Sequence, residues 1–177
     1  SEKYSIYNLL GILNSSVTQE ILDSISPSLH YGVGEIKKIP LKLINNELDI
    51  KELVRIYAED WGSVETSYEF STLPIIANKS ETKSIKNNYA SLMAIQEESI
   101  KKALSLEKNN NIQCLEAYNI NKNDYQDISE RDLTLFINPY YKFSNIKDDN
   151  LIKKAQQSET SQSLLSYSIG CMMGRYS

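Results

Sequence analysis

The sequence is poor in the residues that most often bind metals or form covalent catalytic intermediates. His30 is its only histidine, and Cys114 and Cys171 are its only cysteines. None of the three stands at a ligand spacing typical of zinc sites, and neither cysteine has a nucleophile motif or a second histidine to pair with. Two cysteines also make no disulfide framework, so we expect reduced thiols in a cytoplasmic protein. The sequence therefore predicts no metal site and no catalytic residue.

Long apolar runs are missing as well. No stretch approaches the roughly 18 residues that a membrane-spanning helix needs, so we expect no membrane partner. The chain has 177 residues, of which 41% are hydrophobic and 24% charged, and this suits a globular fold with a real core. The N-terminal "SEKYSIYNLL" has no initiator methionine and no signal-peptide pattern. We interpret the chain as a piece of a longer protein.

Positive charge is in deficit. The 19 lysines and arginines are outnumbered by 23 acidic residues, which gives a net charge of -4 and a pI of about 5.1. A free-standing DNA-binding module usually has a basic face, so this balance argues against tight, autonomous DNA binding. Lys37, Lys38 and Lys42 form one small basic spot and are our candidates for contact with DNA phosphates. Such a cluster is more often only a solvated edge.

Glycine is also scarce, with six residues, and this bears on the only catalytic motif in view. "LTLFINPYY" (133–141) resembles the Asn-Pro-Pro-Tyr loop of DNA adenine methyltransferases, which holds and stacks a flipped base. Here Tyr140 replaces the second proline. Such an enzyme also needs a glycine-rich turn between a strand and a helix for S-adenosylmethionine, whereas "YGVGE" (31–35) precedes a predicted strand. We therefore expect a packed turn at Asn138, no active site and no bound cofactor in this chain.

The apolar pattern that is present predicts a mainly α fold. Apolar residues recur three and four apart over 50–61, 81–108 and 148–174, and two shorter helices are expected within 5–25. "NNN" at 109–111 should end or interrupt the long helix, because asparagine is a weak helix former. A few short strands are expected near residues 29–44 and 131–138, where the pattern is extended.

Several short sequence motifs, called family words below, resemble segments of one protein family. "DWGSVETSYEF" (60–70) is similar to DWDSFETSWDF, and "LLSYSIGCMMGRYS" (164–177) is close to LISYAVGCMFGRYS. Both words are typical of the PglX family, the adenine-specific DNA methyltransferases of BREX phage-defence systems, which are related to restriction-modification enzymes. "CLEAYNI" (114–120) and "DLTLFINPYYKF" (132–143) resemble further family segments. Residues 7–41 look like the closing part of a target-recognition region, although their LNS and IPL words are widely shared.

The resemblance implies a parent enzyme that methylates adenine N6 at a defined site with S-adenosylmethionine. This piece would follow the catalytic domain, with residues 1–44 ending target recognition and residues 45–177 forming a helical spacer or interaction region. Its expected role is to link or support target recognition. The alternative is a helical protein-interaction module that docks other defence subunits without contacting DNA.

The two strongest family words also have purely structural interpretations. In the first, Trp61 and Tyr68 would be buried, and Ser63 or Thr66 would cap a helix. In the second, Gly170 and Gly174 would allow close helix approach, and Arg175 would pair with a carboxylate. We interpret Glu65 as an ordinary surface carboxylate.

Overall fold

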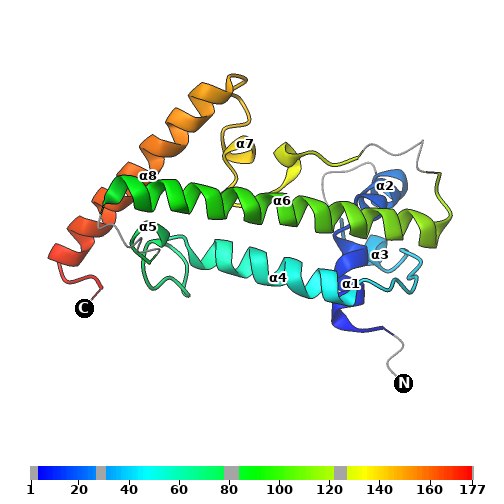
Figure 1. Ribbon diagram of the computed structural model, residues 1–177. Helices are drawn as coiled ribbons and strands as arrows, with labels where there is room; N and C mark the ends of the chain where they lie inside the picture. Colours follow the sequence, from blue (N-terminus) through cyan, green and yellow to red (C-terminus); the bar gives the residue numbers. More distant parts are fainter. Residues whose placement is uncertain (1–3, 27–30, 78–83, 122–126, 177) are drawn as a thin grey trace. The chain divides into compact units, whose positions relative to one another are not determined.

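The computed structural model describes residues 4–26, 31–77, 84–121 and 127–176, and regular structure within them is helical. The elements are α1 (Ile6–Leu13), α2 (Ser16–Ile25), α3 (Val33–Ile36), α4 (Glu47–Gly62), α5 (Pro74–Ala77), α6 (Ile85–Tyr118), the 3-10 turn η2 (Glu130–Asp132), α7 (Pro139–Lys142) and α8 (Asp149–Met172) (Figure 1). The predicted mainly α class is confirmed. His30, for which no metal-binding role is predicted, lies outside the described residues.

The chain divides into two compact units, each built from two separate stretches of sequence. Unit 1 comprises Ser1–Arg55 and Ala103–Ile128, and unit 2 comprises Ile56–Lys102 and Ser129–Ser177. The division therefore falls inside α4 and inside α6. The domain boundary expected after residue 44 came from the family resemblance and stays a prediction.

Unit 1 has a small apolar core closed by the last turns of α6. Ser5 and Ser15 begin α1 and α2 as N-caps, since each side-chain oxygen accepts a backbone N–H of the first turn. The buried core residues are Ile12, Val17, Ile44, Cys114 and Leu115. Burial of these side chains is the main stabilising contribution, because apolar surface leaves water.

The long helix α6 continues through the asparagine run, so the predicted break at 109–111 is wrong (Figure 1). Asn110 Nδ2 donates to the Gly11 carbonyl at 2.9 Å, and Asn111 Oδ1 accepts the Ser16 N–H at 3.0 Å. Both asparagines are buried. Their amides bond to α1 and α2 instead of competing for their own backbone, and this tertiary use outweighs their weak helix propensity.

Unit 2 is held by a second apolar cluster. Leu73 and Ile75 near α5 meet Leu92 of α6, and Leu164 and Tyr167 of α8 pack against them. Asp148 begins α8, because its carboxylate accepts the Asn150 N–H at 2.8 Å. Although α6 has 34 residues and α8 has 24, none of the described helices combines the length and apolarity that a bilayer crossing requires.

Leu92→Ala tests this cluster directly. Leu92 is 5% exposed, so truncation removes buried apolar surface and leaves a cavity, at an expected cost of about 3 kcal/mol. Urea unfolding followed by circular dichroism measures the loss. Ile95→Ala, at a position 46% exposed on the same helix, is the matched control. Equal effects of the two variants would show that Leu92 does not pack as described.

The short strands expected near 29–44 and 131–138 are absent from the described residues, and this part of the fold prediction is wrong. Residues 31–44 contain the single turn α3 and then an irregular loop. Residues 133–135 have no regular structure, with Leu133 and Leu135 fully buried, and residues 136–137 form a turn in which the Asn138 N–H donates to the Leu135 carbonyl at 3.0 Å. The alternating pattern that predicted strands is thus real. Both segments bond to side chains instead of to a neighbouring strand, as described below.

Candidate functional site

The predicted phosphate contacts lie on one loop of unit 1. Lys37 is the C-cap of α3, Lys38 follows it in the same turn, and Lys42 lies four residues further on. All three side chains are exposed, and among the described residues none of them forms an ion pair. The ammonium groups are therefore accessible to an anion. DNA contact through them stays a prediction.

Side chains fix the backbone of this lysine loop. Tyr118 donates its hydroxyl to the Pro40 carbonyl at 2.7 Å, and Asn8 Nδ2 donates to the Ile44 carbonyl at 2.7 Å. Ile39 is buried beneath the loop. These anchors replace the ladder hydrogen bonds of the strand expected here, and they hold the loop without a sheet.

In unit 2 the first family word is bonded to the asparagine-proline segment through Asp60. This carboxylate accepts the Phe136 N–H at 2.7 Å and the Ile137 N–H at 2.9 Å. Burial raises the pKa of Asp60 above its ordinary value, although the two backbone donors act in the opposite direction by favouring the ionised form. Asp60 therefore satisfies the two backbone N–H groups of the turn at residues 136–137.

Asn138, the residue of the catalytic resemblance, is fully buried. Its Nδ2 donates to the Glu130 carbonyl at 2.7 Å and to the Leu133 carbonyl at 2.9 Å. Its Oδ1 accepts the Tyr140 N–H at 3.1 Å, which makes Asn138 the N-cap of α7. Both amide donors are used inside the chain, so this geometry supports the packed turn rather than recognition of a base.

The two most distinctive family words meet at Glu65. Arg175 Nη1 lies 3.1 Å from Glu65 Oε1, the Tyr176 hydroxyl donates to the same oxygen, and Ser166 Oγ donates to Oε2 at 3.3 Å. The interpretation of Glu65 as an ordinary surface carboxylate is therefore wrong. The expected pairing of Arg175 with a carboxylate is confirmed.

Aromatic rings and two glycines complete this junction. Tyr167 and Tyr176 stack with ring centroids 4.7 Å apart, and Phe70 lies 5.9 Å from each ring. A Cβ on Gly170 would lie 2.8 Å from Tyr176 Cε2, so only glycine lets the tyrosine ring approach α8. Gly174 has a φ of 77° and reverses the chain after the helix. Within unit 2, Gly170 therefore allows the Tyr176 ring to approach α8, and Gly174 allows the chain to turn after α8.

Protonation of Glu65 should weaken this junction. The pKa of Glu65 is held below its ordinary value, first by the Tyr176 hydroxyl bond. A depressed carboxyl pKa gives stability that is present above the unfolded-state value of about 4.3 and is lost as the pH falls through the folded value. We expect the stability difference between wild type and Glu65→Gln to shrink as the pH falls from about 5 to about 3.

Chemical unfolding across that range measures the difference. Tyr176→Phe is the matched variant, because it keeps the stacked ring and removes only the hydroxyl. It should raise the pKa of Glu65 and flatten the pH dependence. An unchanged pH profile in Tyr176→Phe would contradict the assigned cause.

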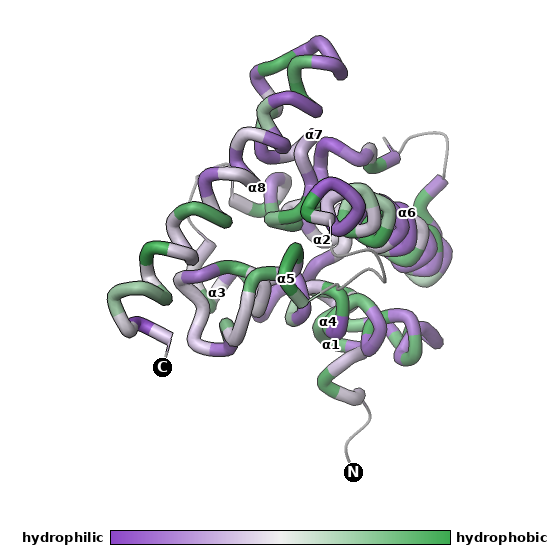
Figure 2. The backbone as a smooth tube through the Cα atoms, turned by 60° about the vertical axis from the view of Figure 1, so that its left-hand side comes forward, coloured by the Kyte–Doolittle hydropathy of each residue, from purple (hydrophilic) through white to green (hydrophobic). Residues whose placement is uncertain are grey.

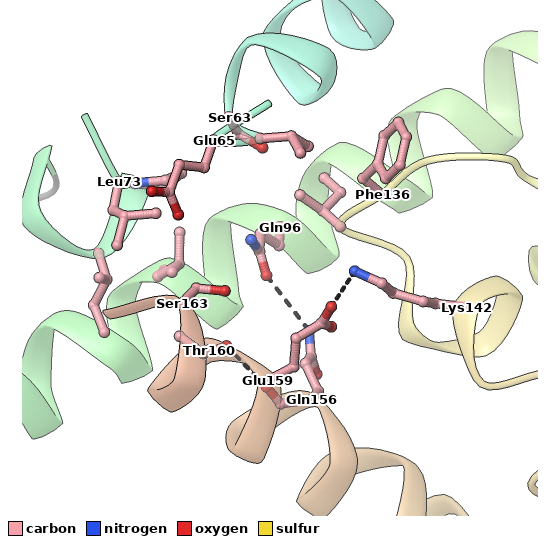
Figure 3. A pocket seen from close by; sticks show the side chains of 15 residues that line it. Ser63, Glu65, Leu73, Gln96, Phe136, Lys142, Gln156, Glu159, Thr160 and Ser163 are labelled. Carbon is pink, nitrogen blue, oxygen red and sulfur yellow. Dashed lines mark hydrogen bonds and ion pairs between the residues drawn. The ribbon is translucent and has the colours of Figure 1, made fainter. Parts of the chain in front are cut away.

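A small cavity in unit 2, with a volume of about 220 Å³, is lined in part by Glu65. Figure 3 shows Glu65, Glu159 and three hydroxyl residues around it, together with the apolar Leu73 and Phe136. Glu159 is paired with Lys142, and Glu65 is bonded as above. The volume is below the roughly 300–1,000 Å³ of typical ligand pockets, and neither carboxylate is free to act as a base. We interpret the cavity as a crevice between packed segments.

A wider hollow of about 810 Å³ lies beside α7 in the same unit. Tyr89 and Tyr140 line it, with Ile100 and Ile152 among its apolar residues. Its charged lining mixes both signs, namely Lys101, Lys153, Lys154, Glu97 and Glu130. This mixture favours neither an anion nor a cation.

Metal-binding and thiol chemistry find no support in the part of the chain that the structure describes. No group of three or more potential ligands gathers there. Cys114 is a buried free thiol whose pKa is raised by desolvation, which makes it a poor nucleophile. Cys171 is free and exposed.

Sequence reasoning missed Asp60 and Glu65 as the residues that organise unit 2. It also predicted burial of Trp61 and Tyr68, but Trp61 is 44% exposed and Tyr68 is fully exposed. Ser63 does close a helix, since its hydroxyl donates to the Asp60 carbonyl at 2.7 Å. The signal that could have identified Asp60 and Glu65 was the first family word, whose polar residues are as distinctive as its aromatic residues.

Comparison with known proteins gives two relatives. No protein-family model matches the chain. The chain is 30% identical over 181 residues to the adenine-specific methyltransferase BrxX of Escherichia coli O9:H4 (strain HS), an alignment that covers 100% of this chain and 14% of that protein. It is 22% identical over 174 residues to the adenine-specific methyltransferase PglX of Lacticaseibacillus casei (strain Zhang), covering 95% of this chain and 13% of that protein. The chain thus spans only a small part of either relative's length.

Proposed function

The chain belongs to the PglX family of adenine-specific methyltransferases, and from this premise we propose that it is a non-catalytic segment supporting target recognition in such an enzyme. The parent enzyme would use S-adenosylmethionine to methylate adenine N6 in cytoplasmic DNA. The methyl mark would let a BREX phage-defence system ignore host DNA. Within that enzyme, this segment would hold a recognition lobe in place.

The observation that carries this proposal is the set of hydrogen bonds and ion pairs that the residues of the family words form with other parts of unit 2. Asp60 joins the first word to the segment around Asn138, and Glu65 joins it to the C-terminal word. These polar groups bond to one another and to backbone. A segment whose most distinctive residues fix its own shape is suited to positioning other parts, because a rigid support holds a site more accurately than a mobile one.

The second candidate function is protein docking without DNA contact. The net charge of -4 favours it, since phosphate neutralisation requires cations. The lysine loop decides between the two functions, because its three exposed ammonium groups are the basic spot that the sequence predicted.

Lys37, Lys38 and Lys42 should be changed together to glutamate in the full-length enzyme. Three lysines neutralise about three phosphates, which corresponds to a log–log salt slope of about -2.7 at most. We expect weaker binding to all DNA sequences alike, a shallower salt dependence and an unchanged methylated motif, because phosphate contacts carry no sequence information. Salt-dependent binding and sequencing of methylated DNA provide the measurements.

The matched control changes Lys147, Lys153 and Lys154 to glutamate, which alters the net charge equally at other exposed positions. If both triple variants weaken binding to the same degree, only overall charge matters, and the docking function is favoured. A changed motif in the first variant would mean that the loop reads bases, which contradicts a supporting role.

A further inference from the structure

The last turns of α8 are apolar on two opposite faces. On the inner face, Leu164 and Tyr167 pack into the core cluster of unit 2, and Gly170 is buried against Tyr176. This face is already occupied by the protein's own side chains. Toward the C-terminal end of α8, hydrophobic stretches alternate with paler, more polar ones (Figure 2).

The outer face carries a second apolar stripe with no partner among the described residues. Leu165, Ile169 and Met172 are spaced by four and three residues, so they share one side of the helix. Their exposed fractions are 63%, 44% and 80%, and the adjacent Met173 is 79% exposed. We call these four residues the outer stripe of α8. An apolar stripe on a helix normally packs against another surface.

Residues 160–174 contain no aspartate, glutamate, lysine or arginine. Charges beside this segment include Glu65, which accepts from Ser166, and Arg175, which is paired with Glu65. Depletion of charge with enrichment of methionine is the composition of an interface core, and exposed apolar patches mark interaction sites. A nucleic acid is a poor occupant, because it would require cations here.

We propose that the outer stripe of α8 docks against an apolar surface elsewhere in the same polypeptide of the full-length enzyme. This inference rests on the proposed function, in which the chain is one segment of a longer protein. The relatives extend far beyond the matched region, since the chain covers 14% and 13% of them. An intramolecular partner of this kind has ample sequence to come from.

The small size of the stripe favours a partner on the same chain. A stable interface between separate proteins usually involves roughly 20–30 residues a side, and the stripe offers four large apolar side chains. A tethered surface needs far less contact area, because the connection supplies an effective concentration of about millimolar. A second copy of the chain would have no such advantage.

The thioether groups of this region provide the test. Peroxide oxidation of Met172 and Met173 is followed by mass spectrometry, in the 177-residue chain and in the full-length enzyme, with maleimide labelling of the cysteines as a folding control. We expect both methionines to be oxidised about tenfold more slowly in the full-length enzyme, because reactivity follows exposure. Buried Cys114 should stay unlabelled in both, which reports that unit 1 is folded.

A double variant shows whether the stripe itself is responsible. Leu165→Gln with Met172→Gln in the full-length enzyme should restore Met173 oxidation to the rate of the 177-residue chain. In that shorter chain the same variant should leave unfolding unchanged, because the side chains are exposed there. The matched control is Leu43→Gln with Leu48→Gln, at residues 61% and 80% exposed in unit 1, and it should leave Met173 oxidation slow.

Three results would overturn the inference. Equal reaction rates in both proteins would show that the stripe stays exposed. Protection that grows with concentration of the 177-residue chain would assign it to a second copy, and protection requiring another subunit would assign it to a separate protein. Failure of the proposed function is distinct, because it would appear as a full-length protein that protects α8 but does not methylate adenine.

Discussion

Asn138→Ala is expected to lower the free energy of unfolding by about 5 kcal/mol, because three backbone groups lose their partner at once. The Glu130 and Leu133 carbonyls lose a donor, and the Tyr140 N–H loses its acceptor. The site is fully buried, so water cannot replace these bonds without rearrangement.

Urea unfolding of the 177-residue chain measures this loss. Asn138→Asp is the matched variant, since it keeps an acceptor for Tyr140 but removes both donors. In the full-length enzyme, any Asn138→Ala protein that remains folded should still methylate DNA. Loss of methylation with unchanged stability would contradict the structural role assigned to this asparagine.

Asn110→Asp should destabilise unit 1 to a similar degree, lowering the free energy of unfolding by about 4 kcal/mol near neutral pH. The substitution keeps the shape of the side chain but places a carboxylate oxygen against the Gly11 carbonyl, where an amide donor now lies at 2.9 Å. The backbone of Gly11 is closely packed here, because a Cβ built on it would lie 3.0 Å from both Asn110 Oδ1 and Ile50 Cδ1.

The pH dependence identifies the cause of this effect. Burial beside a carbonyl should raise the folded-state pKa of the new aspartate, so the loss should shrink as the pH falls toward the unfolded value of about 3.9. Asn145→Asp, at an exposed position, is the control and should change stability by less than about 0.5 kcal/mol. A loss that does not vary with pH would contradict the proposed repulsion.

The helices could be predicted from sequence because their signals are local. Apolar spacing of three and four residues located α4, α8 and the start of α6 to within about four residues, but it placed the end of α6 ten residues too early. The asparagine run misled the prediction, because the amides of Asn110 and Asn111 bond to residues about a hundred positions away. No propensity scale includes such partners.

The predicted strands failed for a related reason. Leu133 and Leu135 alternate with exposed neighbours as strand residues do, but the chain turns directly after them, and Asp60 bonds to the two N–H groups of that turn. A single acidic side chain gives no periodic signal. The junction at Glu65 was equally hidden, since its partners Arg175 and Tyr176 lie more than a hundred residues away. Only the family words indicated that these residues matter.

The discontinuous make-up of unit 1 has a consequence for biosynthesis. Its first 55 residues must wait for residues 103–128 before they can complete a core, and the Asn110–Gly11 bond spans 99 positions. A ribosome adding about 5–20 residues per second takes about 5–20 seconds to make that stretch. Ile12 and Val17 emerge without Cys114 and Leu115, so the earliest part of this chain stays open to chaperones and proteases until α6 is nearly complete.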